Sequence, residues 1–178
     1  MEIIATELAG LHVIRPRVFE DARGSFVKTY HAEMLREAGL AFQPQEEFFS
    51  VSRRNVIRGM HLLMPPHAQT RLVYCISGKV LDVVVDLRKA SRTLGHVLTR
   101  ELSATNREML FIPEGFAHGF LTLDENSVMV YLASPVHSPP HDAGIAWNSI
   151  GFQWPVKDPV LSDRDLKFPA LCDFQSPF

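Results

Sequence analysis

The chain has 178 residues, of which 46% are hydrophobic and 21% are charged, and its formal net charge is −2. This composition is typical of a globular protein with one core, and the length is short for two domains. The weak negative charge excludes a broad basic surface for nucleic acid, and the lack of an apolar run of about 18 residues excludes a membrane-spanning segment.

The amino-terminal residues lack the basic start and the apolar stretch of a signal peptide, so we expect a cytoplasmic protein. The two cysteines, Cys75 and Cys172, are too few and too dispersed for a disulfide framework or a zinc knuckle. We expect both to be free thiols of a reducing compartment.

Short β-strands are predicted over most of the first three quarters of the chain. Apolar and polar residues alternate in Lys79–Leu87, which follows Leu72–Ile76 across a Ser77-Gly78 turn typical of a hairpin. One helix is predicted over His31–Ala38, ending at Gly39. Many short strands with one helix favour a β-sandwich or barrel over alternating βα units. The other predicted strands are Leu11–Val18, Ser25–Tyr30, Phe48–Ser52, His96–Leu102, Met109–Ile112, Gly119–Leu123 and Val128–Ala133.

The last quarter of the chain has a different character. Prolines interrupt the periodicity from Ser134 onward, but large apolar side chains such as Trp147, Trp154 and Phe168 recur between them. Such a stretch is too apolar for a disordered tail. We therefore expect a single domain over residues 1–178, with a barrel core at about 45–134 and an ordered extension at about 135–178 packed against it.

Two histidines stand in contexts that suit chemistry. His61 ends the strand-like segment Arg58–His61 and precedes Pro65-Pro66, so we expect it where a strand gives way to a loop. A histidine there suits a general base because its ordinary pKa lies near 6.5. His118 follows a turn at Pro113–Gly115 that would aim its imidazole into the mouth of a barrel. Taken alone, each histidine also fits a purely structural role.

Six segments, in order, carry a resemblance to a known family. The first is a Phe-x-Asp-x-Arg-Gly-x-Phe element, and the fourth contains Pro-x-Gly-x-x-His. The segments are Phe19–Phe26, Val56–His61 with Pro65–Gln69, Asp82–Arg88, Ile112–Phe120, Gly144–Trp147 and Leu161–Asp165. Over nearly its whole length the chain resembles the dTDP-4-dehydrorhamnose 3,5-epimerase family.

The resemblance implies a mainly β fold, a cupin-type double-stranded β-helix (jelly-roll) barrel with a few short helices. It also implies a homodimer that works without a metal or another cofactor. The implied activity is epimerisation at C3, C5 or both of a nucleotide-diphosphate-linked 4-keto-6-deoxyhexose, in deoxysugar biosynthesis for cell-surface polysaccharides. The expected reaction converts dTDP-4-dehydro-6-deoxyglucose to dTDP-4-dehydrorhamnose by removing a proton next to the ketone.

Roles for individual residues follow from the same resemblance. His61 is the implied base, Asp165 the carboxylate that orients it, and Tyr131 the acid that returns a proton to the opposite face of the sugar. Arg58 is expected to bind the diphosphate, with Arg23 reaching it across the dimer. The remaining expected substrate contacts are Lys28, Phe48, Arg71, His118 and His137.

Several of these positions differ from what is usual in the family. Arg71 replaces a lysine beside the enolate oxygen, and arginine stabilises an oxyanion but is a poor proton donor. Lys28 replaces a glutamate, Phe48 an asparagine, Leu62-Leu63 a Tyr-Gln pair and Val136-His137 a tyrosine pair. These changes concern recognition of the sugar and the base. The alternative is therefore a single-carbon epimerase on another nucleotide sugar, such as a CDP-deoxyhexulose, because lysine suits the acceptor edge of cytosine.

Two other classes compete with this interpretation. A metal-dependent cupin enzyme needs a His-x-His pair with a nearby glutamate, but His61 is followed by two leucines and only His118 is well placed. A sugar-binding cupin without catalysis is the second alternative. Retention of His61, Asp165 and Tyr131 argues against it, because binding alone needs no base and acid.

Overall fold

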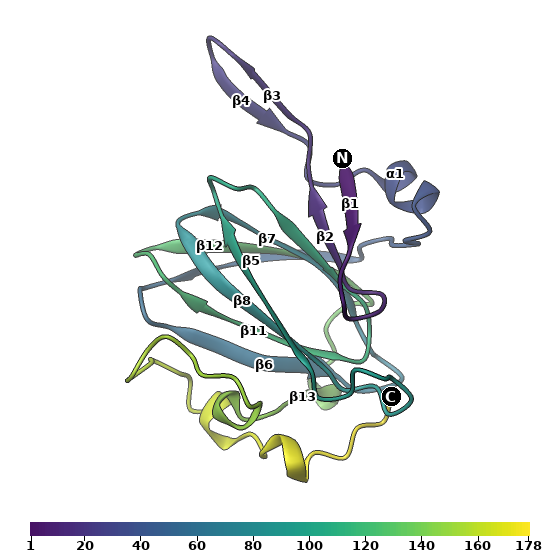
Figure 1. Ribbon diagram of the computed structural model, residues 1–178, viewed down its shortest axis with the longest axis vertical. Coiled ribbons are helices and arrows are strands. Elements are labelled where there is room, and N and C mark those ends of the chain that lie inside the picture. The colour runs from purple at the N-terminus through teal and green to yellow at the C-terminus, as the bar shows by residue number, and fades with distance from the viewer.

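The computed structural model describes all 178 residues, and two antiparallel β-sheets face each other to form its body (Figure 1). The six-stranded sheet has the order β1-β2-β10-β7-β12-β5, and the five-stranded sheet has the order β13-β6-β11-β8-β9. The strands are β1 (Glu2–Ala5), β2 (His12–Arg15), β3 (Val18–Asp21), β4 (Gly24–Val27), β5 (Glu46–Ser52), β6 (Ile57–Leu63), β7 (Thr70–Ser77), β8 (Lys79–Asp86), β9 (Val97–Ser103), β10 (Met109–Ile112), β11 (Phe116–Thr122), β12 (Ser127–Ser134) and β13 (Asp142–Gly144). The predicted jelly-roll of mainly β structure is confirmed.

Helices contribute little to this architecture. The one α-helix, α1 (Ala32–Glu37), begins after His31, whose side chain accepts a hydrogen bond from the Met34 N–H. The 3₁₀ turns are η1 (Pro139–His141), η2 (Trp147–Ser149), η3 (Asp165–Lys167) and η4 (Leu171–Asp173), all after the last long strand. No helix is long and apolar enough to span a membrane.

Three predicted features are wrong in detail. The predicted strand Leu11–Val18 is two strands, because Pro16 has no N–H to donate and separates β2 from β3. His61 lies inside β6 rather than at the start of a loop, since pairing with β13 carries the strand on to Leu63. His118 likewise lies within β11, which begins at Phe116 and not after the histidine.

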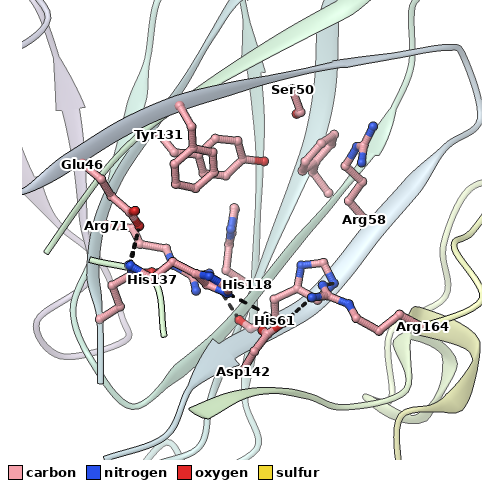
Figure 2. A pocket seen from close by; sticks show the side chains of 13 residues that line it. Glu46, Ser50, Arg58, His61, Arg71, His118, Tyr131, His137, Asp142 and Arg164 are labelled. Atoms are coloured by element: carbon pink, nitrogen blue, oxygen red, sulfur yellow. Dashed lines mark hydrogen bonds and ion pairs between the residues drawn. The ribbon is translucent and has the colours of Figure 1, made fainter. Parts of the chain in front are cut away.

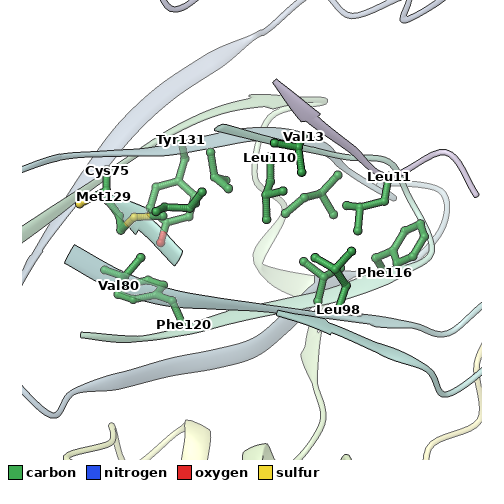
Figure 3. Close-up of a cluster of buried hydrophobic side chains, with 14 of the residues drawn as sticks. Leu11, Val13, Cys75, Val80, Leu98, Leu110, Phe116, Phe120, Met129 and Tyr131 are labelled. Carbon is green, nitrogen blue, oxygen red and sulfur yellow. The ribbon is translucent and has the colours of Figure 1, made fainter. Parts of the chain in front are cut away.

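The main core fills the space between the two sheets. Figure 3 shows side chains of the six-stranded sheet, such as Val13 and Leu110, facing Val80, Leu98 and Phe120 of the five-stranded sheet. Each strand contributes alternate residues to this space because successive side chains point to opposite faces. Burial of this apolar surface is the dominant favourable contribution to folding, at about 25 cal/mol per Å².

The outer faces of both sheets are covered in part. Residues 135–178 run below the five-stranded sheet (Figure 1), where Trp147, Phe152 and Trp154 pack against a cluster that includes Val83 and Val85. The other sheet is covered by the helical segment, whose Leu35, Leu40 and Phe42 pack against Leu72 and Tyr74. The polar cavity described below lies in the space between the sheets.

One hairpin stands apart from this body. Strands β3 and β4 pair only with each other and project outward beyond the amino terminus (Figure 1). On this arm Phe19 is 48% exposed and Phe26 is 61% exposed. At its tip Arg23 pairs with Asp21, and both are exposed. A hairpin with two exposed aromatic rings has apolar surface to bury against something outside this chain.

Candidate active site

A cavity of about 500 Å³ lies between the two sheets and collects polar side chains from both (Figure 2). Strands β5, β7 and β12 supply one wall, and β6, β11 and β13 supply the other. The lining residues are Glu46, Phe48, Ser50, Arg58, His61, Gln69, Arg71, His118, Phe120, Tyr131, His137, Asp142 and Arg164. This is the largest pocket described, and such pockets commonly hold the substrate.

The predicted pair of His61 and Asp165 is formed. His61 Nε2 lies 2.9 Å from Asp165 Oδ1, and the Gly59 N–H donates to Asp165 Oδ2 at 3.1 Å. Burial alone would raise the pKa of Asp165, but its contact with His61, the positive charge that His61 carries when protonated, and the hydrogen bond from the Gly59 N–H lower it to about 2. Asp165 is therefore a carboxylate at neutral pH and can orient the imidazole.

His61 is suited to remain neutral in this site. Burial lowers the pKa of His61, and the charges of Arg164 and Arg71 lower it further, while Asp165 acts in the opposite direction. An imidazole with a lowered pKa is unprotonated at neutral pH. It can therefore accept a proton from a substrate carbon.

Two glycines place His61 opposite His118. The two histidines are direct partners in the pairing of β6 with β11, and the register shifts just after them. At Gly59, which has a φ of +138°, an added Cβ would lie 2.5 Å from the Gly119 Cα. Only glycine permits this close approach of the two backbones. The approach brings both imidazoles to one wall of the cavity.

His118 has a buried carboxylate of its own. Its Nε2 lies 2.8 Å from Asp82 Oδ2, and both side chains are almost fully buried. Asp82 is two residues along β8 from Val84, the strand partner of His118, so it projects on the same face. Sequence reasoning missed Asp82, although it opens the quoted segment Asp82–Arg88.

Tyr131 reaches the cavity from the facing sheet. Its ring on β12 is buried, and Phe48 stacks on it with ring centroids 4.8 Å apart and planes inclined by 10°. Burial and the charge of Asp82 raise the pKa of Tyr131 well above its ordinary value, despite opposing effects of Ser50, Arg71 and Arg58. The phenol is therefore protonated and can donate a proton.

Arg71 is fixed between the two walls. Its Nε donates to Gln69 Oε1 at 2.9 Å, and Nη1 donates to the His61 carbonyl at 3.4 Å. Gln69 is itself held by Glu46, to which it donates at 3.0 Å. Burial lowers the pKa of Arg71, but guanidinium is so basic that it stays charged. Glu46 and Gln69 are further site residues that sequence reasoning missed.

Two more arginines line the cavity. Arg58 Nε donates to Ser52 Oγ at 2.9 Å, and Nη2 donates to the Val51 carbonyl at 3.3 Å. Arg164 forms ion pairs with Asp142 and Asp165 and has a half-exposed side chain. Arg164 was not predicted, although it directly precedes Asp165 in the sequence. Two arginines in one cavity suit a diphosphate, which accepts bidentate hydrogen bonds.

Not every predicted contact lies in the cavity. Arg23 lies at the tip of the projecting arm and Lys28 directly follows its strand β4, and both are absent from the cavity lining of this chain. His137 lines the cavity, where its backbone N–H donates to Glu46 Oε1 at 3.0 Å. No three His, Cys, Asp or Glu side chains are grouped as a metal site would require.

Sequence comparison finds several similar proteins that are dTDP-4-dehydrorhamnose 3,5-epimerases. A family model described as dTDP-4-dehydrorhamnose 3,5-epimerase matches residues 5–173. The chain is 40% identical over 176 residues to the dTDP-4-dehydrorhamnose 3,5-epimerase of Shigella flexneri, with 97% of each chain covered.

Solved structures agree with the sequence comparison. The dTDP-4-dehydrorhamnose 3,5-epimerase of Bacillus anthracis, with TDP and PPi bound, superposes with a TM-score of 0.93 at 37% identity, covering 96% of this chain and 99% of that one. The dTDP-6-deoxy-D-glucose-3,5-epimerase of Legionella pneumophila, in complex with dTDP-4-keto-L-rhamnose, superposes with a TM-score of 0.93 at 31% identity, covering 98% and 94%.

Proposed function

Because this chain belongs to the dTDP-4-dehydrorhamnose 3,5-epimerase family, we propose that it inverts C3, C5 or both carbons of a dTDP-linked 4-keto-6-deoxyhexose. The expected reaction converts dTDP-4-dehydro-6-deoxyglucose to dTDP-4-dehydrorhamnose. One observation supports this most strongly: a histidine–carboxylate pair and a protonated tyrosine lie on facing walls of one cavity. A sugar ring between the walls would present one face to each.

The first step is removal of a proton next to the ketone. His61 takes the proton, and the C–H electron pair becomes part of an enolate whose charge rests on the C4 oxygen. Asp165 stabilises the imidazolium that forms. Arg71 is the group available to stabilise the oxyanion, since it keeps its charge and is held in the cavity by Gln69.

The second step returns a proton from the opposite side. Tyr131 donates its phenolic proton to the carbon, and the enolate collapses back to the ketone with the carbon inverted. Exchange with solvent then reprotonates Tyr131 and deprotonates His61. Return of the proton from the side of His61 would restore the starting sugar, so inversion requires both walls.

The proposed nucleotide, dTDP, follows from the family and can be tested with substrate. Arg58 and Arg164 supply positive charge in the cavity for a diphosphate. Phe48, which replaces an asparagine usual in the family, stacks on Tyr131 and thus covers the proposed acid. Incubation with dTDP-4-dehydro-6-deoxyglucose should give an inverted product. A preference for a CDP-linked 4-keto sugar under the same conditions would favour the alternative substrate over dTDP.

A homodimer is part of the same proposal. Exposed apolar side chains lie on the arm, at Phe19 and Phe26, and on the edge strand β5, where Phe49 is 68% exposed and Val51 is 51% exposed. Edge strands and exposed apolar patches are common sites of association. We propose that the arm of one protomer reaches the cavity of the other and brings Arg23 and Lys28 to its substrate.

The free thiols of Cys75 and Cys172 suit the proposed cytoplasmic location.

Mixing two inactive variants tests the shared site. Arg23→Ala damages the arm and His61→Asn damages the cavity, so a mixed dimer would contain one complete site. Random assortment makes about half of the dimers mixed, and activity should recover to roughly a quarter of the wild-type level. The measurement is the epimerisation rate after the two variants are co-expressed.

A matched control uses two lesions in the same cavity. Co-expression of His61→Asn with Asp165→Asn leaves every site of every dimer incomplete, so no recovery is expected. Equal recovery in both mixtures, or none with Arg23→Ala, would show that the arm does not complete the site of a partner.

A further inference from the structure

Arg164 and Asp165 approach the same nitrogen of His61. Arg164 Nη2 lies 2.7 Å from His61 Nε2, and Asp165 Oδ1 lies 2.9 Å from it (Figure 2 shows Arg164 extended toward the His61 ring). Arg164 Nε also contacts Asp165 Oδ1 at 3.3 Å. A guanidinium only donates hydrogen bonds and a carboxylate only accepts them. One ring nitrogen therefore cannot satisfy both partners at the same time.

The two partners select different tautomers of neutral His61. A hydrogen bond from Arg164 requires a bare Nε2, which leaves the ring proton on Nδ1. A hydrogen bond to Asp165 requires a proton on Nε2, which leaves Nδ1 bare. Because Asp165 holds Nε2, the nitrogen free to accept a substrate proton is Nδ1. Only the tautomer selected by Asp165 is a competent base.

We propose that Arg164 gates the base: it holds His61 in the incompetent tautomer while the site is empty, and the substrate diphosphate draws it away. This inference rests on the proposed function for the identity of the ligand. The side chain of Arg164 is 50% exposed and lines the cavity together with Arg58. Phosphate oxygens offer bidentate, charge-assisted hydrogen bonds to this guanidinium, in competition with its contacts to His61, Asp142 and Asp165.

Arg164 and Asp165 are held by different contacts. Arg164 precedes the short turn η3, its guanidinium lies 5.5 Å from the centre of the Phe168 ring, and it also pairs with Asp142. The Asp165 carboxylate accepts a hydrogen bond from the Gly59 N–H, and the Asp165 backbone N–H donates to Ser162 Oγ, so we expect the carboxylate to remain beside His61 when the arginine leaves.

The gate has a consequence for pH dependence. The charged or titratable groups around His61 are Arg164, Asp165 and Arg71, with Asp142 behind Arg164 and His118 on the paired strand. Arg164 lowers the pKa of His61 and Asp165 raises it. Withdrawal of Arg164 therefore moves the pKa of His61 upward. The acid limb of kcat, which reports the substrate complex, should lie at higher pH than that of kcat/KM, which reports the free enzyme.

Nitrogen NMR of the His61 ring tests the gate without reference to catalysis. The ¹⁵N shifts of Nδ1 and Nε2 identify which nitrogen carries the proton, and His61→Asn assigns the signals. At a pH where His61 is neutral, the ligand-free protein should show mainly Nδ1–H, and saturating dTDP should convert it to mainly Nε2–H. Arg164→Met, which lacks a donor, should show Nε2–H before any ligand is added.

Two matched variants separate the gate from simple loss of charge. Arg164→Lys keeps a donor and should retain the ligand-dependent change. Arg58→Met removes a cavity arginine that does not touch His61, so the change should persist but require more dTDP. The same ligand-free tautomer in the wild type and Arg164→Met would overturn the gate. Failure of dTDP to bind would count against the proposed function, whereas the ligand-free comparison would still decide the gate.

Discussion

Replacing His61 with asparagine should lower the rate of proton exchange between the sugar and solvent by about 10²–10⁴, the usual contribution of one positioned base. Asparagine keeps a polar side chain of similar size but cannot take up a proton. The Asp165 carboxylate would remain anchored by the Gly59 N–H, so the wall of the cavity should be preserved. Binding of dTDP should therefore be nearly unchanged, because the diphosphate is assigned to the arginines.

The measurement is loss of deuterium or tritium label from the carbons next to the ketone, followed with each protein. A variant that exchanges at more than a tenth of the wild-type rate would remove His61 from the role of base. For the wild-type protein, the acid limb of the pH profile of kcat/KM should lie below pH 6.5, the ordinary pKa of histidine. The reason is that burial lowers the pKa of His61 in the free enzyme, which kcat/KM reports.

Replacing Tyr131 with phenylalanine should separate exchange from inversion. The variant retains His61 and Asp165, so it can still remove a proton and return it to the same face. It lacks the phenolic proton that the opposite face requires, so inversion should fall by about 10²-fold or more while exchange without inversion continues. The stack with Phe48 should survive the change, since only the hydroxyl is deleted.

Product configuration and label content are measured in the same sample. Equal losses of exchange and inversion would mean that Tyr131 is needed for proton removal itself. An unchanged rate of inversion would exclude Tyr131 as the acid. Phe48→Leu is a useful companion, because it removes the aromatic neighbour and leaves the phenol in place.

Local patterns account well for the strands of the main body. The alternation in Lys79–Leu87 predicts β8 to within one residue, because the face of a side chain depends only on local spacing. The segment Met109–Ile112 coincides with β10. By contrast, β13 has only three residues, and it exists because Gly144 and its neighbours pair with β6. Pairing partners that are distant in sequence cannot be predicted from spacing.

The residues of the candidate site also fall into two groups, those that the sequence predicts and those that only the structure shows. The family resemblance implies the identities of His61, Asp165 and Tyr131, and the structure places His61 and Tyr131 in the cavity wall with Asp165 against His61. The partner of His118 depends on the register of β8 against β11, which no local pattern specifies, so Asp82 was missed. Arg164 directly precedes Asp165, but its contact with His61 depends on the path of the chain after Ser162. Its importance is visible only in three dimensions.

For the projecting arm, the sequence predicts which residue contacts the substrate but not in which protomer. Its motif predicts Arg23 as a substrate contact, but in this chain Arg23 lies at the tip of a hairpin that projects from the body. A sequence motif does not say whose cavity a residue enters. The expectation that Arg23 acts across a dimer therefore stays a prediction, to be decided by the mixing experiment.

The most direct test of the proposed chemistry is epimerisation in deuterated water. The wild-type protein acts on dTDP-4-dehydro-6-deoxyglucose, and NMR and mass spectrometry locate deuterium in the product, with His61→Asn measuring spontaneous exchange next to the ketone. We expect one deuterium at each inverted carbon and none elsewhere, because each inversion removes a proton to one wall and takes another from the facing wall. Inversion that retains the original hydrogen at the inverted carbon would contradict the account.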